Sequence, residues 1–346
     1  MDKPKIAVVG AGLIGKNHIR LIAENPNCDL AAVVDPFDAS KVIALEQGVP
    51  HFEDLEALLN ANIADGIILA TPNNLHVRQA LMCIKHRIPT LIEKPVAQSL
   101  EEGNTLLEIA QVDPLIDDSL LVGHHRMHSP IIKQTKALID SGKLGNLVAV
   151  QGSALFYKPD DYFEAAPWRT QAGGGPILIN LIHEIGNLRY LCGEIVDVQA
   201  MASNHQRQYE VEDTVAINLR FASGALGTFI LSDTAASPRS WEQTSQENKS
   251  YASYPNEECY HIAGTKGSIS VPSMQLKYYA NDDDRSWWKP FECEAMALDR
   301  KDPLVEQLNH FCRVIRKEEK PLVTVKDGLQ NLRVTEAVVE AVQNIK

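Results

Sequence analysis

Three glycines near the start of the chain constrain its fold more than any other feature. Gly10, Gly12 and Gly15 form a G-x-G-x-x-G pattern that follows an apolar run at residues 6–9 and opens a helix-like segment. In a strand–turn–helix unit, the first glycine permits the tight turn, the second lets the backbone approach a pyrophosphate, and the third allows close packing. The pattern predicts a dinucleotide site at a helix N-terminus. The residues expected to form it are Gly10, Gly12, Leu13, Ile14 and Gly15.

An acidic residue follows at the end of the second predicted strand. Asp35 lies twenty residues after Gly15, the spacing typical of a carboxylate that binds the adenosine ribose. Such a carboxylate repels a 2′-phosphate, and none of the next three residues is an arginine that would bind one. We therefore expect NAD to be preferred over NADP. The alternative interpretation is an ordinary glycine turn followed by a solvated aspartate.

Apolar runs and helix-period segments alternate through the first third of the chain. The predicted strands are residues 5–10, 29–35, 65–70, 89–93 and 120–124. The predicted helices between them are residues 13–23, 55–61, 75–86 and 100–110. This alternation is typical of a parallel, doubly wound α/β sheet, which we expect to occupy a first domain at residues 1–124.

The rhythm changes in the remainder, residues 125–346, where strands follow one another with short turns. The predicted strands are residues 146–157, 196–203, 214–221, 225–233, 258–263 and 268–271, with hairpin turns at 221–225 and 264–267. Three helices are predicted at residues 176–191, 303–317 and 325–342, of which the last two can pack back on the first domain. We expect an α+β domain with an open, mostly antiparallel sheet. A polar insert at residues 237–257 is long enough to suggest a functional loop.

Composition excludes several classes of partner. The formal net charge is −12 and no run of Lys and Arg is present, which argues against nucleic acid and against an anionic membrane surface. No apolar run approaches the roughly 20 residues of a membrane span, and no signal-peptide core follows the N-terminus. The six cysteines include no CxxC pair, so neither a disulfide framework nor a zinc site is expected. We expect a cytoplasmic protein.

Three further motifs occur in a fixed order along the chain. They are Ala70-Thr-Pro-Asn-Asn-Leu-His76, Glu93-Lys-Pro95, and Gly173-Gly-Gly175 before a helix that carries His183. With the C-terminal Pro321-Leu-Val-Thr pattern, they resemble the glucose–fructose oxidoreductase/inositol dehydrogenase (Gfo/Idh/MocA) family over essentially the whole chain. The resemblance implies a Rossmann domain, a C-terminal sheet for substrate binding and oligomerisation, and reversible hydride transfer with nicotinamide. An exposed face on that sheet would favour a homodimer or homotetramer, since open sheets tend to be covered.

The first two motifs supply further candidate cofactor contacts. Thr71, Pro72 and Asn74 follow a predicted strand at the carboxyl edge of the sheet, where cofactors bind in such folds. An ordinary turn with Thr71 or Asn73 capping a helix explains them equally well. The resemblance adds His76, Glu93 and Lys94 to the expected cofactor contacts.

Lys94 and His183 are the candidate catalytic residues. The resemblance implies that Lys94 polarises the substrate oxygen and that His183 takes the hydroxyl proton of a secondary alcohol, in a sugar, cyclitol or sugar acid. Partial burial would lower the pKa of Lys94, and the Lys94–Pro95 bond is a candidate for the cis form. Without the resemblance, a surface lysine in a turn and a packed core histidine would be the plainer interpretations.

One departure from the family pattern affects this site. The family's aspartate four residues before the histidine is replaced by Ile179, while Asn180 lies three residues before His183 on nearly the same helix face. An asparagine orients a hydroxyl but exchanges no proton. Glu184 lies about 100° around the helix and is a poor substitute. The departure leaves open an NAD-recycling lyase or glycosidase, and a non-catalytic regulator that senses NAD or a sugar.

A second departure is the histidine-rich segment Gly123-His-His-Arg-Met-His128. Three histidines in six residues suggest a metal site, but they lack the H-E-x-x-H arrangement, so no metal is predicted. We expect His124, His125 and Arg126 to line the substrate crevice and His128 to be structural.

Aromatic and basic residues before the glycine turn complete the predicted substrate wall. Trp168 and Arg169 are the principal candidates, because a guanidinium binds a carboxylate through two parallel hydrogen bonds. Tyr157, Tyr162 and Trp241 are candidates for stacking on a ring face. Packing at a domain interface explains these aromatic residues equally well.

Overall fold

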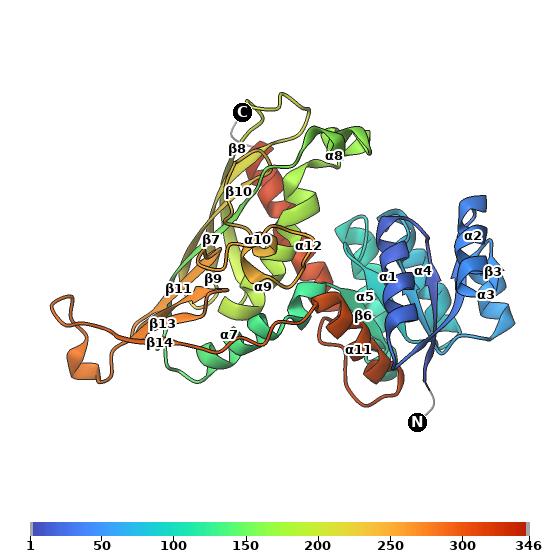
Figure 1. Ribbon diagram of the computed structural model, residues 1–346, viewed down its shortest axis with the longest axis horizontal. Coiled ribbons are helices and arrows are strands. Elements are labelled where there is room, and N and C mark those ends of the chain that lie inside the picture. Colours follow the sequence, from blue (N-terminus) through green and yellow to red (C-terminus); the bar gives the residue numbers. More distant parts are fainter. Residues whose placement is uncertain (1–2, 344–346) are drawn as a thin grey trace. The chain divides into compact units, whose positions relative to one another are not determined.

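A computed structural model describes residues 3–343, which form two compact units (Figure 1). Unit 1 combines the residues up to His128 with Pro303–Leu332, and unit 2 combines Ser129–Asp302 with the residues from Arg333 onward. The chain therefore leaves unit 1, builds most of unit 2, and returns. The boundary predicted after residue 124 lies close to the first crossing, and the return at Pro303 places the helix predicted at 303–317 in unit 1.

Unit 1 contains a six-stranded parallel sheet. Its strands, in spatial order, are β3 (His51–Phe52), β2 (Asp29–Val34), β1 (Lys5–Val9), β4 (Gly66–Leu69), β5 (Thr90–Glu93) and β6 (Leu120–Gly123). The strands are buried on both faces, as parallel sheets require, and Ile67 and Ile68 have no exposed surface. The order reverses between β1 and β4, which is the switch point where such sheets bind ligands. The predicted doubly wound α/β fold is confirmed.

Helices connect these strands. They are α1 (Leu13–Glu24), α2 (Asp38–Gln47), α3 (Leu55–Ala61), α4 (His76–Lys85), α5 (Leu100–Val112) and α6 (Pro114–Asp117). Asp54 and Ser99 cap α3 and α5 by accepting from the backbone N–H three residues on. Sequence analysis missed α2, because only Ser40 and Ala44 of this helix are buried and no apolar stripe marks it.

Two C-terminal segments complete unit 1. Helix α11 (Pro303–Ile315) packs where Gly66 has no side chain, since a Cβ there would clash with Ile315 Cδ1. Val122 of β6 donates its N–H to Val323 O at 2.9 Å. Helix α12 (Val325–Gln343) then begins after Thr324, whose hydroxyl and N–H both donate to the Asp327 carboxylate.

Unit 2 contains an eight-stranded sheet. Its strands are β7 (Leu147–Leu155), β8 (Ile195–Ser203), β9 (Thr214–Phe221), β10 (Leu226–Ser232), β11 (Tyr260–Gly264), β12 (Gly267–Val271), β13 (Gln275–Tyr278) and β14 (Glu292–Ala295). They lie in the order β14-β13-β12-β11-β7-β10-β9-β8, antiparallel except for the β7–β10 pair. The open, mostly antiparallel sheet and both predicted hairpins are confirmed. Strand β14 was missed because all four of its residues are exposed.

Helices cover one face of this sheet (Figure 1). They are α7 (Pro130–Asp140), α9 (Ile182–Cys192) and the later part of α12, with short helices α8 (Asp160–Glu164) and α10 (Trp241–Ser245) in the loops. Ile185 and Leu188 of α9 join Ile217 and Phe221 of β9 in one apolar core. The other face is open, and every second residue of β9 is exposed there. Assembly through that face stays a prediction.

Three further findings concern membrane-spanning helices, groups of possible metal ligands and the cysteines. Within residues 3–343, none of the helices has the length and apolar character that crossing a bilayer requires. The same residues contain no group of three or more His, Cys, Asp or Glu side chains placed to hold a metal ion. All six cysteines are free thiols, and only Cys293 is exposed.

Candidate functional site

The glycine loop between β1 and α1 has the geometry that a bound dinucleotide needs. Gly10 has a φ of +92°, and a Cβ at this position would lie 2.7 Å from Ala70 O of the neighbouring β4 connection. A Cβ at Gly15 would clash with Gly10 O, so this glycine lets α1 approach the loop. A Cβ at Gly12 would meet nothing within 4 Å. The loop is thus tightly packed beneath Gly10 and Gly15 and open above Gly12.

The open side of the loop carries hydrogen-bond donors. Gly12 caps α1 without a side chain, so no side-chain acceptor of the cap occupies the first-turn N–H groups. Leu13 is 83% exposed beside them. A pyrophosphate fits this combination of open space, donors and helix dipole.

Asp35 lies at the end of β2, next to this loop. Its Oδ2 accepts from Ala11 N at 2.8 Å and its Oδ1 accepts from Phe37 N at 2.9 Å. Both oxygens retain lone pairs for further donors, such as ribose hydroxyls. No arginine follows Asp35 in the turn before α2, as the sequence indicates.

The segment after β4 forms a turn that His76 holds in place. The buried His76 ring contacts Pro95 O through Nδ1 at 2.8 Å and Thr71 O through Nε2 at 2.9 Å. Burial lowers its pKa against the opposing effect of the two carbonyls. Pro72 precedes a short 3₁₀ turn, Asn73–Leu75, that has no side-chain cap, and the Thr71 hydroxyl donates to Gln79. Neither Thr71 nor Asn73 is therefore the helix cap considered from sequence, while Pro72 and Asn74 are exposed.

Glu93 is the last residue of β5, and Lys94 follows it. Both lie at the carboxyl edge of the sheet, the edge at which the glycine loop follows β1. Burial opposes ionisation of Glu93, but His18 Nε2 at 2.7 Å and the charges of His18 and Lys94 hold the Glu93 pKa below its ordinary value. Burial also lowers the pKa of Lys94, and Arg126 adds to this effect while Glu93 opposes it. Lys94 is thus a half-buried amine beside a permanent carboxylate. The Lys94–Pro95 peptide bond is cis, which confirms that expectation.

The histidine-rich segment after β6 is mostly buried. His124 is 1% exposed and its Nε2 lies 3.2 Å from Asn331 Nδ2, and Arg126 is 4% exposed. The ring of His128 meets the ring of His310 edge-on, at 5.1 Å between centroids. Burial and Arg126 lower the pKa of His125 to about 3, so this ring is neutral at physiological pH. Of the segment's three histidines, only His125 is part-exposed.

In unit 2, His183 lies near the start of α9, just after a π-helical turn. The turn spans Ile177–Leu181 and contains Ile179 and Asn180. Such turns are rare and often occur at functional sites, because they shift side chains around the helix. The glycines before it pack closely, since a Cβ at Gly174 would lie 2.5 Å from Arg169 O and one at Gly175 would lie 2.6 Å from Glu212 Oε1.

The remaining predicted residues of unit 2 have varied surroundings. The Arg169 guanidinium stacks on the Tyr162 ring, 3.8 Å from its centroid, and donates to Tyr162 O. Trp168 is 54% exposed. Glu184 accepts a hydrogen bond from the buried Tyr260 hydroxyl, which occupies this carboxylate within the core. Trp241 packs on Tyr260 and is 3% exposed, so packing accounts for this ring, and its suggested role in stacking on a substrate stays a prediction.

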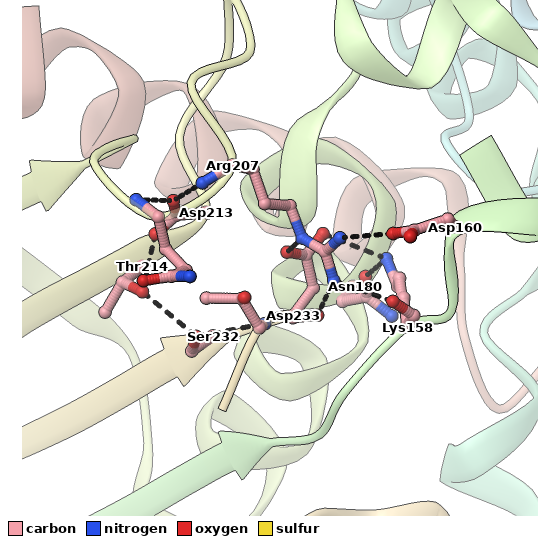
Figure 2. Close-up of polar contacts among 10 residues, drawn as sticks. Lys158, Asp160, Asn180, Arg207, Asp213, Thr214, Ser232 and Asp233 are labelled. Atoms are coloured by element: carbon pink, nitrogen blue, oxygen red, sulfur yellow. Dashed lines mark hydrogen bonds and ion pairs between the residues drawn. The ribbon is translucent and has the colours of Figure 1, made fainter. Parts of the chain in front are cut away.

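Sequence analysis missed a polar network at the edge of the unit 2 sheet (Figure 2). Lys158 and Asp233 follow β7 and β10, and Arg207 comes from the loop between β8 and β9. Lys158 Nζ donates to Asn180 Oδ1 at 2.7 Å, and Arg207 Nε lies 3.0 Å from Asp233 Oδ1. The missing signal was the parallel pairing of β7 with β10, which brings the ends of both strands to one edge.

Comparison with known proteins gives the family. Residues 4–116 match the oxidoreductase family with an NAD-binding Rossmann fold, and residues 132–270 match the GFO/IDH/MocA C-terminal domain. The chain therefore belongs to the Gfo/Idh/MocA oxidoreductase family, and its N-terminal part is the NAD-binding Rossmann domain.

Two relatives and one solved structure illustrate the similarity. A rhizopine catabolism protein, MocA of Rhizobium meliloti, is 31% identical over 194 residues, covering 56% of this chain and 59% of that protein. Inositol 2-dehydrogenase 1 of Mycolicibacterium vanbaalenii is 30% identical over 233 residues, covering 65% and 64%. The matched part thus spans about three fifths of each relative. The fold is also that of scyllo-inositol dehydrogenase from Lactobacillus casei, with a TM-score of 0.78 at 18% identity, covering 100% of this chain and 98% of that one.

Proposed function

We propose that the protein is an NAD-dependent dehydrogenase that acts on a secondary alcohol of a polyhydroxylated substrate, such as a sugar, cyclitol or sugar acid. The observation that carries this proposal is the glycine loop, open above Gly12 and joined through Ala11 to the Asp35 carboxylate. Lys94 follows β5 at the same carboxyl edge of the sheet as the glycine loop, two strands from β1. The same loop supports NAD over NADP, because Asp35 would repel a 2′-phosphate.

The residues of unit 1 have distinct roles in holding the cofactor. The Gly10–Gly15 loop would bind the pyrophosphate, and Asp35 would accept from the ribose hydroxyls. Bound NAD⁺ would supply the hydride acceptor, so that a secondary alcohol and NAD⁺ would give a ketone, NADH and a proton. His76 supports this region by holding the Thr71 turn against Pro95.

The remaining steps belong to three side chains. The Lys94 ammonium polarises the substrate oxygen and stabilises the negative charge that develops on it. His183 takes the hydroxyl proton, because imidazole is the side chain most often used as a general base. Asn180 orients a neighbouring hydroxyl without exchanging a proton. Glu93 is a positioning residue, because its negative charge favours the cationic form of the adjacent Lys94.

The names of related proteins support the substrate class. One relative is named an inositol 2-dehydrogenase, and the Lactobacillus casei structure contains NAD(H) and scyllo-inositol. A cyclitol or sugar offers the secondary hydroxyls that the proposed chemistry needs. We propose that the protein works as a homodimer or homotetramer through the open face of the unit 2 sheet, where Met201 and Leu226 are exposed.

The test is the formation of NADH with a panel of inositols, sugars and sugar acids. Lys94→Ala and His183→Ala should each lower kcat by roughly 10²- to 10⁴-fold and leave the affinity for NADH nearly unchanged. Matched controls are Lys85→Ala in unit 1 and His205→Ala in unit 2, both exposed positions. Wild-type turnover in the Lys94 and His183 variants would contradict the assignment. Tightly held NAD that recycles without net NADH would favour the lyase alternative suggested by Ile179.

A further inference from the structure

The network at the end of β7 and β10 joins the sheet of unit 2 to the segment that carries His183. Because these strands are parallel neighbours, with Leu155 paired to Ser232, the residues after them emerge at one edge. Lys158 N donates to Asp233 O at 2.9 Å, which fixes the two segments together. Lys158 Nζ then donates to Asn180 Oδ1 at 2.7 Å (Figure 2). A lysine amine is thereby placed beside the residue three positions before His183.

The carboxylate of Asp233 is largely committed to a different cation. Arg207 Nε lies 3.0 Å from Asp233 Oδ1, and both side chains are nearly buried, at 6% and 4% exposure. The same guanidinium donates to Lys158 O at 2.7 Å and to Asp233 O. Lys158 Nζ is 3.7 Å from Asp233 Oδ2, beyond hydrogen-bond distance. Asp233 therefore neutralises Arg207 first and Lys158 only in part.

Other acidic side chains near the network are turned to different partners. Asp213 accepts from the backbone N–H groups of Gln206 and Arg207, each at 3.0 Å, and from the Thr214 hydroxyl. Glu212 accepts from Ile177 N at 2.9 Å. Asp160 lies 3.7 Å from Arg207 and is 78% exposed, where water screens its charge. None of these three carboxylates forms a hydrogen bond or an ion pair with the Lys158 amine.

A second cation contacts the same aromatic ring as Lys158. The Tyr162 ring lies 3.8 Å from the Arg169 guanidinium carbon and 4.8 Å from Lys158 Nζ, measured to its centroid. Lys158 thus has one carboxylate, Asp233, and two guanidiniums, Arg169 and Arg207, as its charged neighbours. Burial and these two cations lower the pKa of Lys158 to about 8. Asp233 and Asp160 pair with Arg207, whereas Arg169 forms no ion pair with a carboxylate of the described residues, so its guanidinium is available to an added anion.

We infer that the substrate carries a carboxylate, which Lys158 and Arg169 bind beside Asn180. The inference rests on the proposed function and narrows its substrate class to sugar acids and related polyhydroxy acids. Arg169 supplies paired donors for the two carboxylate oxygens, and Lys158 supplies a point charge. Asn180 connects this charge to the His183 segment, so the acid group fixes which hydroxyl faces the imidazole. Lys158 is accordingly a specificity-determining residue.

The test compares an acid with its neutral isostere. D-glucuronate, D-galacturonate and D-gluconate are titrated calorimetrically into the full-length protein with NADH present, alongside D-glucuronamide and D-galactose. We expect the acids to bind roughly tenfold or more tightly than the neutral compounds, because a hydrogen bond to a charged group contributes enough binding free energy for that ratio. The preference should vanish in Lys158→Met, weaken in Arg169→Gln, and persist in Lys158→Arg and in the control Lys277→Met. Thermal melting verifies that each variant is folded.

The outcomes separate this inference from the proposed function. Equal binding of acid and amide, an acid preference that survives Lys158→Met, or no binding of any acid in the panel would each overturn it. If neutral inositols form NADH at least as well as the acids, the dehydrogenase assignment stands and the carboxylate site is wrong. If acids bind through Lys158 but no compound forms NADH, the carboxylate site stands and the dehydrogenase assignment is wrong.

Discussion

Asp35 accepts a hydrogen bond from Ala11 N at 2.8 Å, which links the end of β2 to the middle of the glycine loop. Its other oxygen accepts from Phe37 N at 2.9 Å. Two backbone donors thus fix the carboxylate in the position from which it would meet a ribose. A carboxylate held in this way discriminates between cofactors without rearrangement, because its orientation is set before binding.

Replacing Asp35 with serine should shift cofactor preference from NAD toward NADP. The change removes the negative charge that disfavours a 2′-phosphate and two charged hydrogen bonds to the ribose, so the ratio of kcat/KM for the two cofactors should move by roughly tenfold or more. Steady-state kinetics with both cofactors measures this ratio. Asp38→Ser is the matched control, since the Asp38 carboxylate is 92% exposed. An unchanged ratio in Asp35→Ser would show that Asp35 does not contact the ribose.

Alanine at Gly12 and at Gly15 should give opposite results. Gly12→Ala places a methyl group in open space, so stability should change by less than about 0.5 kcal/mol while NADH affinity falls. Gly15→Ala forces a methyl group against Gly10 O and should lower the melting temperature by several degrees. Thermal melting and NADH fluorescence titration measure both effects. Wild-type NADH affinity in Gly12→Ala would mean that the pyrophosphate does not lie above this loop.

Removing the buried charge of Glu93 should shift the pH dependence of catalysis. Glu93 raises the pKa of Lys94 against the stronger effect of burial, so Glu93→Gln should lower that pKa further. If the cationic amine is the active form, the alkaline limb of kcat/KM moves to lower pH. Glu24→Gln, on the exposed face of α1, is the control. A profile that does not move would remove Lys94 or its charge from the mechanism.

The preference for acidic substrates should decline above neutral pH. Lys158 is cationic below its pKa of about 8 and neutral above it, so the carboxylate loses a positive partner as pH rises through 8. The ratio of kcat/KM for glucuronate to that for glucuronamide should therefore fall above pH 8. Any pH dependence of kcat/KM that the two substrates share does not affect this ratio. Lys158→Arg should keep the ratio constant, because arginine stays charged. A ratio independent of pH in the wild type would contradict the role of the Lys158 charge.

The fold was predictable because its signals are local. Apolar runs alternating with helix-period segments located the main strands of unit 1, and the turn at 221–225 located a hairpin of unit 2. The two-residue strand β3 and the helix α2 gave no such signal, since one is very short and the other buries only Ser40 and Ala44. Strand β14 could not be predicted either, because it has no buried face and therefore no alternation of apolar and polar residues.

The site was predictable only where one motif contains its whole geometry. The glycine loop and Asp35 lie within one strand–helix–strand unit, so spacing alone located them. The contact between Lys158 and Asn180 joins residues 22 positions apart and depends on which strands pair, which no local pattern records. Burial could not be predicted from the sequence either. His124 and Arg126 were expected to line a crevice, and both are buried. Their predicted role remains untested.

The hydrogen bond from Val122 to Val323 has a consequence for biosynthesis. A ribosome releases the strands of unit 1 long before it makes α11, whose side chain Ile315 fills the space over Gly66. A nascent chain ending near residue 128 would therefore hold a cofactor fold with uncovered apolar surface, a species prone to aggregate. Unit 2 behaves topologically as a large insertion. Truncation at residue 128 should consequently give an insoluble fragment, whereas joining residues 1–128 to 303–332 with a flexible linker should recover an NAD-binding domain.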